Sequence, residues 1–170
     1  ALVNNEVGTV QPLDRIAAVV RERAPHALLH TDASQALCWL DLRHHAAPAD
    51  LVTLASHKCG GPRGMGALVV RSGAVLQAQQ VGGGQERERR SGTQDVASAV
   101  AFSVAAEIAD SDRHELVERV RPWRDALVEA VLSGVPGAIE SAVTSGDRSH
   151  VVAGIANVCL PGVDSEALLF

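Results

Sequence analysis

Residues 50–55 (DLVTLA) constrain the fold most, because they are apolar almost without interruption. A strand with one face in water alternates apolar and polar residues, whereas a strand covered on both faces does not. Directly after this run come Ser56, His57 and Lys58, followed by a glycine-rich segment. The run therefore predicts a buried strand in a layered α/β domain, with a reactive or solvated lysine at its end.

The remaining pattern alternates helices and short strands. Apolar residues recur at helical spacing over 12–24, with Pro12 suited to the first turn. Short apolar stretches at 27–30 and 66–71 predict further strands, and a longer one at 150–161 predicts another. Residues 95–110 and 112–133 read as two alanine-rich helices, the second kinked or restarted at Pro122. This order predicts an α/β layer with a largely parallel sheet.

A change of character after Gly92 predicts two domains, with a boundary near residues 112–120. We assign residues 1–115 to the C-terminal part of a large domain and residues 116–170 to the start of a smaller α+β domain. The sequence opens on Ala-Leu-Val and closes on Glu-Ala-Leu-Leu-Phe, without the polar character typical of termini. We therefore expect an internal piece of a longer protein.

Composition narrows the function classes. The chain has 170 residues, of which 46% are apolar, so it can bury a core. Its formal net charge of −5 argues against a nucleic-acid partner, which requires a basic face. No apolar run approaches the roughly 20 residues of a membrane span. Three cysteines without a C-x-x-C pair indicate reduced thiols and predict a cytoplasmic protein.

Three groups of polar residues follow predicted strands. They are Asn4-Asn5-Glu6, then Asp32 with Gln35, then Ser56 with His57 and Lys58. In open α/β sheets, ligands bind outside the carboxyl ends of the strands. We therefore expect a carboxylate, amides and an amine to gather on one rim of the sheet, where they could hold a cofactor.

The chemistry that these residue types support best is that of pyridoxal phosphate. It requires a lysine amine to hold it as a Schiff base and a carboxylate against its ring nitrogen. Lys58 and Asp32 fill these two roles, and Ser56 and His57 could contact the phosphate. The simpler alternatives are a solvated Lys58, an Asp32 that only caps a helix and an Asn5 that only shapes a turn.

The sequence lacks the motifs of nucleotide-binding sites and of serine hydrolases. Neither glycine-rich segment fits a P-loop or a dinucleotide fingerprint, and no G-x-S-x-G motif is present. The pairs His30 with Asp32 and His44 with His45 have no second ligand cluster, so we predict no metal site.

Five segments, in order, resemble the class V aminotransferase family, a group of pyridoxal-phosphate-dependent enzymes of fold type I. Within it, the cysteine desulfurases that supply sulfur for iron–sulfur clusters are the most similar. The resemblance covers essentially the whole chain. The segments are NNEVGTVQP (4–12), HTDASQ (30–35), ASHKCGGPRGMGALVV (55–70), GGGQERERRSGT (82–93) and NVCLPGVDSEALL (157–169).

The resemblance implies a role for each matching residue. Lys58 would be the catalytic lysine that holds the cofactor, and Asp32 would pair with its pyridinium nitrogen. Asn5 and Gln35 would reach the ring hydroxyl and nearby substrate atoms, and His57 would contact the phosphate.

The resemblance also implies partners and a reaction. Thr93, in the RSGT motif, would reach the cofactor phosphate of a second subunit, which implies a homodimer. The enzyme would convert L-cysteine to L-alanine and pass persulfide sulfur to an acceptor or an iron–sulfur scaffold protein.

Departures from the family pattern leave alternatives open. Ala55 stands where the family usually has a phosphate-binding serine, so Ser56 is the nearest hydroxyl. The family's nucleophilic cysteine and its carboxylate-binding arginine match nothing in this sequence. We therefore expect this chain alone to be inactive. The alternatives are another class V enzyme, such as a selenocysteine lyase, or a non-catalytic remnant or interaction module.

Overall fold

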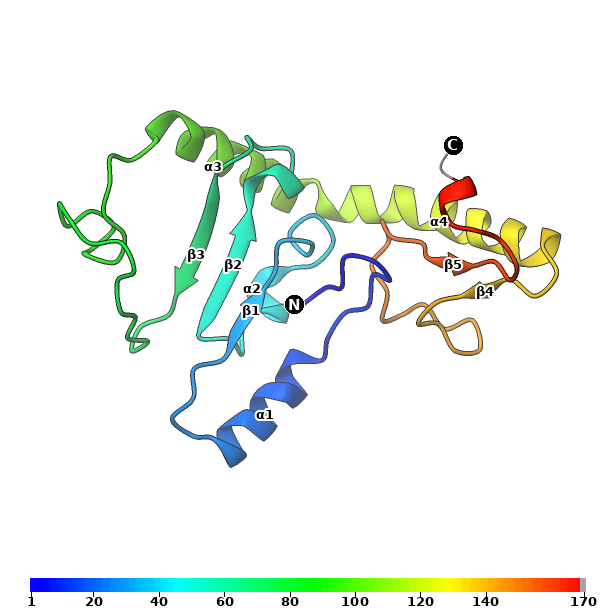
Figure 1. Ribbon diagram of the computed structural model, residues 1–170, viewed down its shortest axis with the longest axis horizontal. Coiled ribbons are helices and arrows are strands. Elements are labelled where there is room, and N and C mark those ends of the chain that lie inside the picture. The colour runs from blue at the N-terminus through cyan, green and yellow to red at the C-terminus, as the bar shows by residue number, and fades with distance from the viewer. Residues whose placement is uncertain (169–170) are drawn as a thin grey trace.

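The computed structural model describes residues 1–168 and places two small sheets along a pair of long helices (Figure 1). Two single turns of 3-10 helix, η1 and η2, follow β2 and β5 respectively. The elements in chain order are α1 (Leu13–Arg23), β1 (His30–Asp32), α2 (Leu42–His45), β2 (Leu51–Ala55), η1 (Ser56–Lys58), β3 (Gly66–Val70), α3 (Val96–Ser111), α4 (Arg113–Gly134), β4 (Ile139–Glu140), β5 (Val158–Cys159) and η2 (Glu166–Leu168).

The first sheet has the strand order β1-β2-β3. Strands β1 and β2 are parallel, with Asp32 opposite Thr53, whereas β2 and β3 are antiparallel, with Ala55 opposite Gly66. The prediction of a largely parallel sheet thus holds for only one of these two strand pairs. A parallel crossover needs about a dozen residues or more, and residues 56–65 are too few to make one.

Most predicted elements are confirmed, including the helices at 13–23, 96–111 and 113–134. Pro122 lies inside α4 without ending it. The residues after Asp32 do not form the helix considered above. They form successive turns, in which the Asp32 carboxylate accepts a hydrogen bond from Ser34 N. The apolar stretch at 150–161 yields only a bridge at Val151 and the short strand β5.

The buried core lies against β1 and β2 and includes Leu2, Val3, Ala33 and Val52. Val152 belongs to the same core, although it comes from the far end of the chain. Two backbone hydrogen bonds hold it there, from Val10 N to His150 O at 2.8 Å and from Val152 N to Gly8 O at 3.0 Å. Residues 150–152 thus pack with the N-terminal segment, although the sequence analysis assigned them to the second domain; the domain division stays a prediction.

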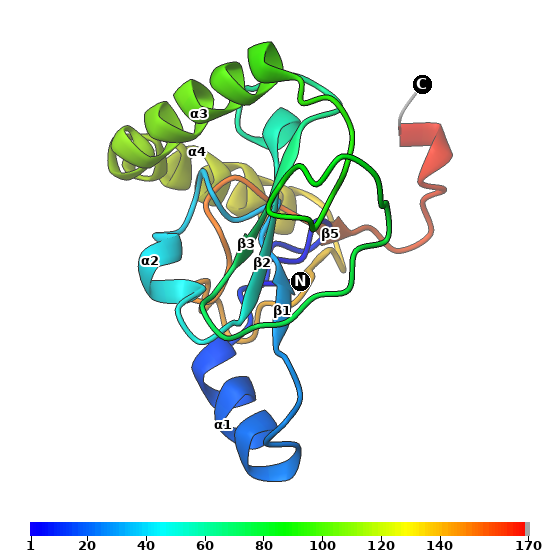
Figure 2. The same cartoon turned by 90° about the vertical axis from the view of Figure 1, so that its left-hand side faces the viewer.

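Helices α3 and α4 run one after the other from the first sheet to the second, which β4 and β5 form as an antiparallel pair (Figure 1). Seen from the side, these helices and α1 lie at opposite ends of the molecule (Figure 2). None of the described helices combines the length and the hydrophobicity needed to cross a membrane.

Candidate functional site

The η1 turn directly after β2 decides which side chains face solvent. The carbonyl oxygen of Ser56 accepts hydrogen bonds from Cys59 N at 3.1 Å and from Gly61 N at 3.0 Å. This tight turn buries the Ser56 side chain completely and leaves His57 and Lys58 exposed. The lysine amine is therefore free to meet a ligand at the carboxyl end of β2.

Ser56 lies beneath this turn. A side chain at Gly61 would collide with the Ser56 hydroxyl, and it would also lie 3.3 Å from Ala105 Cβ of α3. Within residues 1–168, the Ser56 hydroxyl has no hydrogen-bond partner. The predicted phosphate contact of Ser56 therefore stays a prediction, and the geometry favours a packing role beneath the lysine turn.

Asp32 supplies an exposed carboxylate at the carboxyl end of β1. Hydrogen bonds from the hydroxyl and the backbone N–H of Ser34 lower the pKa of Asp32, and the nearby His30 acts in the same direction. A carboxyl group with a lowered pKa is ionised at neutral pH. The negative charge of Asp32 can thus stabilise the protonated form of a basic nitrogen next to it.

The register of the sheet brings Asp32 and Lys58 to the same edge. Asp32 lies opposite Thr53, and Lys58 follows Thr53 after the last two residues of β2 and the start of η1. Both residues therefore follow the carboxyl ends of neighbouring parallel strands, as the sequence predicts.

Asn5 and Gln35 lie next to this edge. Leu2 N donates to Asp32 O at 2.7 Å, which holds the N-terminal segment beside the end of β1. Asn5 is exposed in the turn that follows, and the side chain of Asn4 stabilises that turn by accepting hydrogen bonds from Glu6 N and Val7 N. Gln35 is half-buried in the turns after Asp32.

Thr93 precedes the N-terminus of α3. It is exposed in the long connection between β3 and α3, which lies on the far side of β3 from β1 (Figure 1). The roles assigned to these residues stay predictions.

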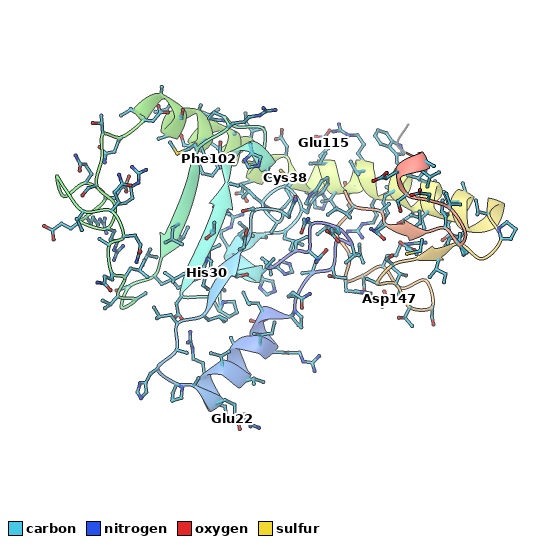
Figure 3. All side chains as sticks on the ribbon, in the orientation of Figure 1. Glu22, His30, Cys38, Phe102, Glu115 and Asp147 are labelled. Atoms are coloured by element: carbon cyan, nitrogen blue, oxygen red, sulfur yellow. The ribbon has the colours of Figure 1, made fainter. Side chains whose placement is uncertain are left out.

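Sequence reasoning missed one of two cysteines beside the lysine turn, Cys38, whereas Cys59 directly follows Lys58 in the sequence. Cys38 Sγ lies 3.6 Å from the backbone oxygen of Lys58, and Cys59 Sγ lies 3.2 Å from that of Ser56. Figure 3 shows Cys38 near α3 and α4. His30, at the start of β1, lies farther from these helices. No spacing motif joins Cys38 to Cys59, so only the fold brings them together. No group of three or more potential metal ligands is found in the described residues.

Comparison with known families decides the identity. The family model of the class V aminotransferases matches residues 1–169. The chain belongs to the class V aminotransferase family. This result agrees with the resemblance seen in the sequence. The sheet and the exposed lysine turn are consistent with it.

Two curated relatives and one solved structure are especially similar to this class V chain. It is 39% identical to a cysteine desulfurase of Gluconacetobacter diazotrophicus over 98% of this chain and 40% of the relative. It is 40% identical to an IscS-like cysteine desulfurase of Mycobacterium tuberculosis over 98% of this chain and 41% of the relative. A solved NifS-like protein superposes with a TM-score of 0.86 at 30% identity, over 98% of this chain and 44% of that one.

These matches confirm the fold type and the similarity to cysteine desulfurases. The chain spans about two fifths of the length of the two curated relatives.

Proposed function

We propose that this chain carries the cofactor-holding centre of a pyridoxal-phosphate-dependent cysteine desulfurase. One observation carries the proposal. An exposed Lys58 after β2 and an ionised Asp32 at the end of the neighbouring parallel strand share one edge of the sheet. The names of the relatives support the substrate class.

The residues at this edge fit the cofactor's chemical groups. When bound, pyridoxal phosphate withdraws electrons from the α-carbon of an amino-acid substrate. Lys58 would hold it through the side-chain amine, and the Asp32 carboxylate would keep a proton on its ring nitrogen. Asn5 and Gln35 would orient the ring, and His57 would contact the phosphate. The Ser56 hydroxyl is buried beneath the Gly61 turn, so its predicted phosphate contact is the least supported of these roles.

The proposed overall reaction converts L-cysteine to L-alanine and passes the sulfur to a cysteine of the enzyme. From there the sulfur would reach an acceptor, such as an iron–sulfur scaffold protein. Thr93, exposed in the connection between β3 and α3, would contact the cofactor of a second subunit in a homodimer. We propose a cytoplasmic location, on the ground of the reduced thiols that the sequence predicts.

Reductive trapping tests the cofactor role directly. Lys58 is the only lysine of the sequence, so the chain offers a single side-chain amine. The purified chain is incubated with pyridoxal phosphate and reduced with borohydride, and its peptides are mapped by mass spectrometry. We expect about one pyridoxyl group per chain, on Lys58, and much less labelling of the urea-unfolded chain at the same cofactor concentration. Equal labelling of the folded and unfolded chains would show that Lys58 is an ordinary solvated amine.

Replacing Asp32 by asparagine tests the partner of the ring nitrogen. The substitution keeps the shape of the side chain but removes the negative charge. A hydrogen bond to a charged group contributes about 1.5–3 kcal/mol, so we expect pyridoxal phosphate to bind about ten to a hundred times more weakly. Cofactor titration followed by absorbance measures this change. Asp14, an exposed carboxylate on α1, offers a matched control as Asp14→Asn. If Asp32→Asn titrates like that control, Asp32 does not contact the cofactor.

A further inference from the structure

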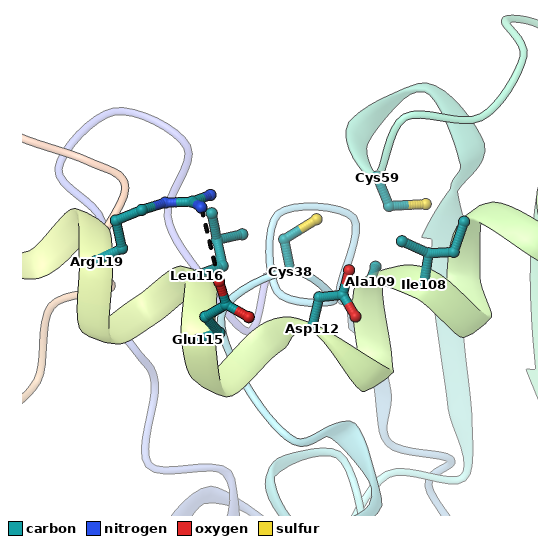
Figure 4. A pocket seen from close by; sticks show the side chains of 8 residues that line it. All are labelled: Cys38, Cys59, Ile108, Ala109, Asp112, Glu115, Leu116 and Arg119. Carbon is teal, nitrogen blue, oxygen red and sulfur yellow. Dashed lines mark ion pairs between the residues drawn. The ribbon is translucent and has the colours of Figure 1, made fainter.

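A cavity of about 270 Å³ lies between the lysine turn and the junction of α3 and α4. Its wall includes two thiols, Cys38 and Cys59, which lie side by side over the helix residues in Figure 4. Asp112, Glu115 and Arg119 face the same cavity, and Arg119 pairs with Glu115 across one helical turn at 3.9 Å. None of these side chains takes part in the function proposed above.

The contact between Cys38 Sγ and the backbone oxygen of Lys58 sets an upper limit on the distance from Cys38 Sγ to Cys59. Cys38 Sγ is 3.6 Å from Lys58 O, and that oxygen belongs to the peptide unit that leads into Cys59. Standard peptide geometry then places Cys38 Sγ within roughly 6.5 Å of Cys59 Cα. A disulfide needs the two Cα atoms to lie about 4.4–6.8 Å apart. The Cys38 sulfur is held beside the backbone that leads into Cys59, so rotation of the two side chains together with movement of the lysine turn would bring the two sulfurs together.

We propose that Cys38 and Cys59 are a dithiol site that a low-molecular-weight disulfide converts to an intramolecular disulfide. One thiolate attacks the S–S bond of the reagent, forms a mixed disulfide and releases one thiol. The second thiolate then attacks the protein sulfur of that mixed disulfide and releases the other thiol. The two cysteines lose two electrons in total and the reagent gains them, while the two protons end on the released thiols.

The surroundings determine how readily the site reacts. Burial raises the pKa of the Cys38 thiol, which the neighbouring Cys59 raises further, and burial likewise raises the pKa of Cys59. Asp112 and Glu115 add negative charge across the cavity, and Arg119 opposes them, while His57 and Lys58 lie on the turn itself. Because only thiolates attack, the bond forms faster at alkaline pH.

The bond would join the two segments that carry the candidate cofactor residues. Cys38 lies in the turns that follow Asp32 and include Gln35, whereas Cys59 directly follows Lys58. Oxidation thus fastens the segment after β1 to the turn after β2. The formation of the bond does not depend on the cofactor, so it can be tested whether or not the proposed function is correct.

The test treats the folded chain with oxidised glutathione at mildly alkaline pH, blocks the remaining thiols and maps the peptides by mass spectrometry. Trypsin places Cys38 in residues 24–43 and Cys59 in residues 59–63, so their disulfide links two separate peptides. We expect this linked pair, with the loss of two hydrogen atoms, in most of the protein. Separate glutathione adducts on both cysteines, a link to Cys159 or no reaction at either cysteine would each overturn the proposal.

Variants make the assignment specific. Cys38→Ser and Cys59→Ser should each stop at a mixed disulfide with glutathione on the remaining cavity cysteine. Cys159→Ser is the matched control, because Cys159 is exposed on β5, and it should keep the linked pair. The same treatment of the urea-unfolded chain should lower the yield of the pair at least severalfold. An equal yield in the unfolded chain would contradict a site built by the fold.

Discussion

Replacing Lys58 by alanine is expected to abolish covalent retention of pyridoxal phosphate and to lower desulfurase turnover in the full-length protein by at least about 10³-fold. The structure gives the reason, because the η1 turn exposes Lys58 at the end of β2 beside the segment of Asp32. Turnover is measured as alanine released from L-cysteine, and retention as pyridoxyl label after borohydride reduction.

Arg63→Ala is the matched control for this substitution. Arg63 is an exposed cation in the same connection between β2 and β3, but it lies outside the η1 turn. It should keep both the label and the turnover of the unmodified protein. Retention of turnover within about tenfold in Lys58→Ala would show that another residue activates the substrate.

Replacing Gly154 by alanine is expected to destabilise the fold by about 3 kcal/mol, the upper range for overpacking, because Gly154 lies against the half-buried Trp39. An added Cβ would run into the ring of Trp39 and would lie 2.7 Å from its Cε2 atom. A rigid indole cannot retreat as the end of a flexible side chain can. Urea unfolding followed by circular dichroism measures the change in the free energy of unfolding.

Two further variants make the Gly154 prediction specific. Gly134→Ala serves as control, because an added Cβ there meets nothing within 4 Å at the end of α4, and it should be neutral or slightly stabilising. Trp39→Leu should recover much of the stability lost in Gly154→Ala, since it removes the ring that the new methyl group strikes. A loss in Gly154→Ala that is unchanged in the double variant would place its cause elsewhere.

Hydrophobic patterning predicted the elements that depend on local sequence. The continuous run at 50–55 became β2, and the alanine-rich segments became α3 and α4, because run length and composition are local features of the sequence. The direction of β3 was not predictable in this way. It depends on the connection from Lys58 to Gly66, which reverses the chain, and the apolar pattern of β3 is the same for either direction.

The candidate site shows the same division between local and tertiary information. Asp32 and Lys58 could be placed at one edge from the sequence, because the carboxyl ends of parallel strands share an edge. The burial of Ser56 could not, since it depends on Gly61 and on α3, which begins far along the chain. The proximity of Cys38 to Cys59 was missed for the same reason, as their common cavity is closed by the junction of α3 and α4.

Residues 150–152 pack against the N-terminal segment, which limits where this chain can be cut to make chimeras with its relatives. A chimera joined between α3 and α4 would take Gly8 and Val10 from one parent and their hydrogen-bonded partners, Val152 and His150, from the other. Exchanging residues 113–149 as an internal cassette keeps both pairs within one parent but separates β4 from β5, which the two-piece hybrid keeps together. A hybrid therefore needs parents whose residues match either at the Gly8–Val152 contact or at the β4–β5 pair, depending on where it is cut.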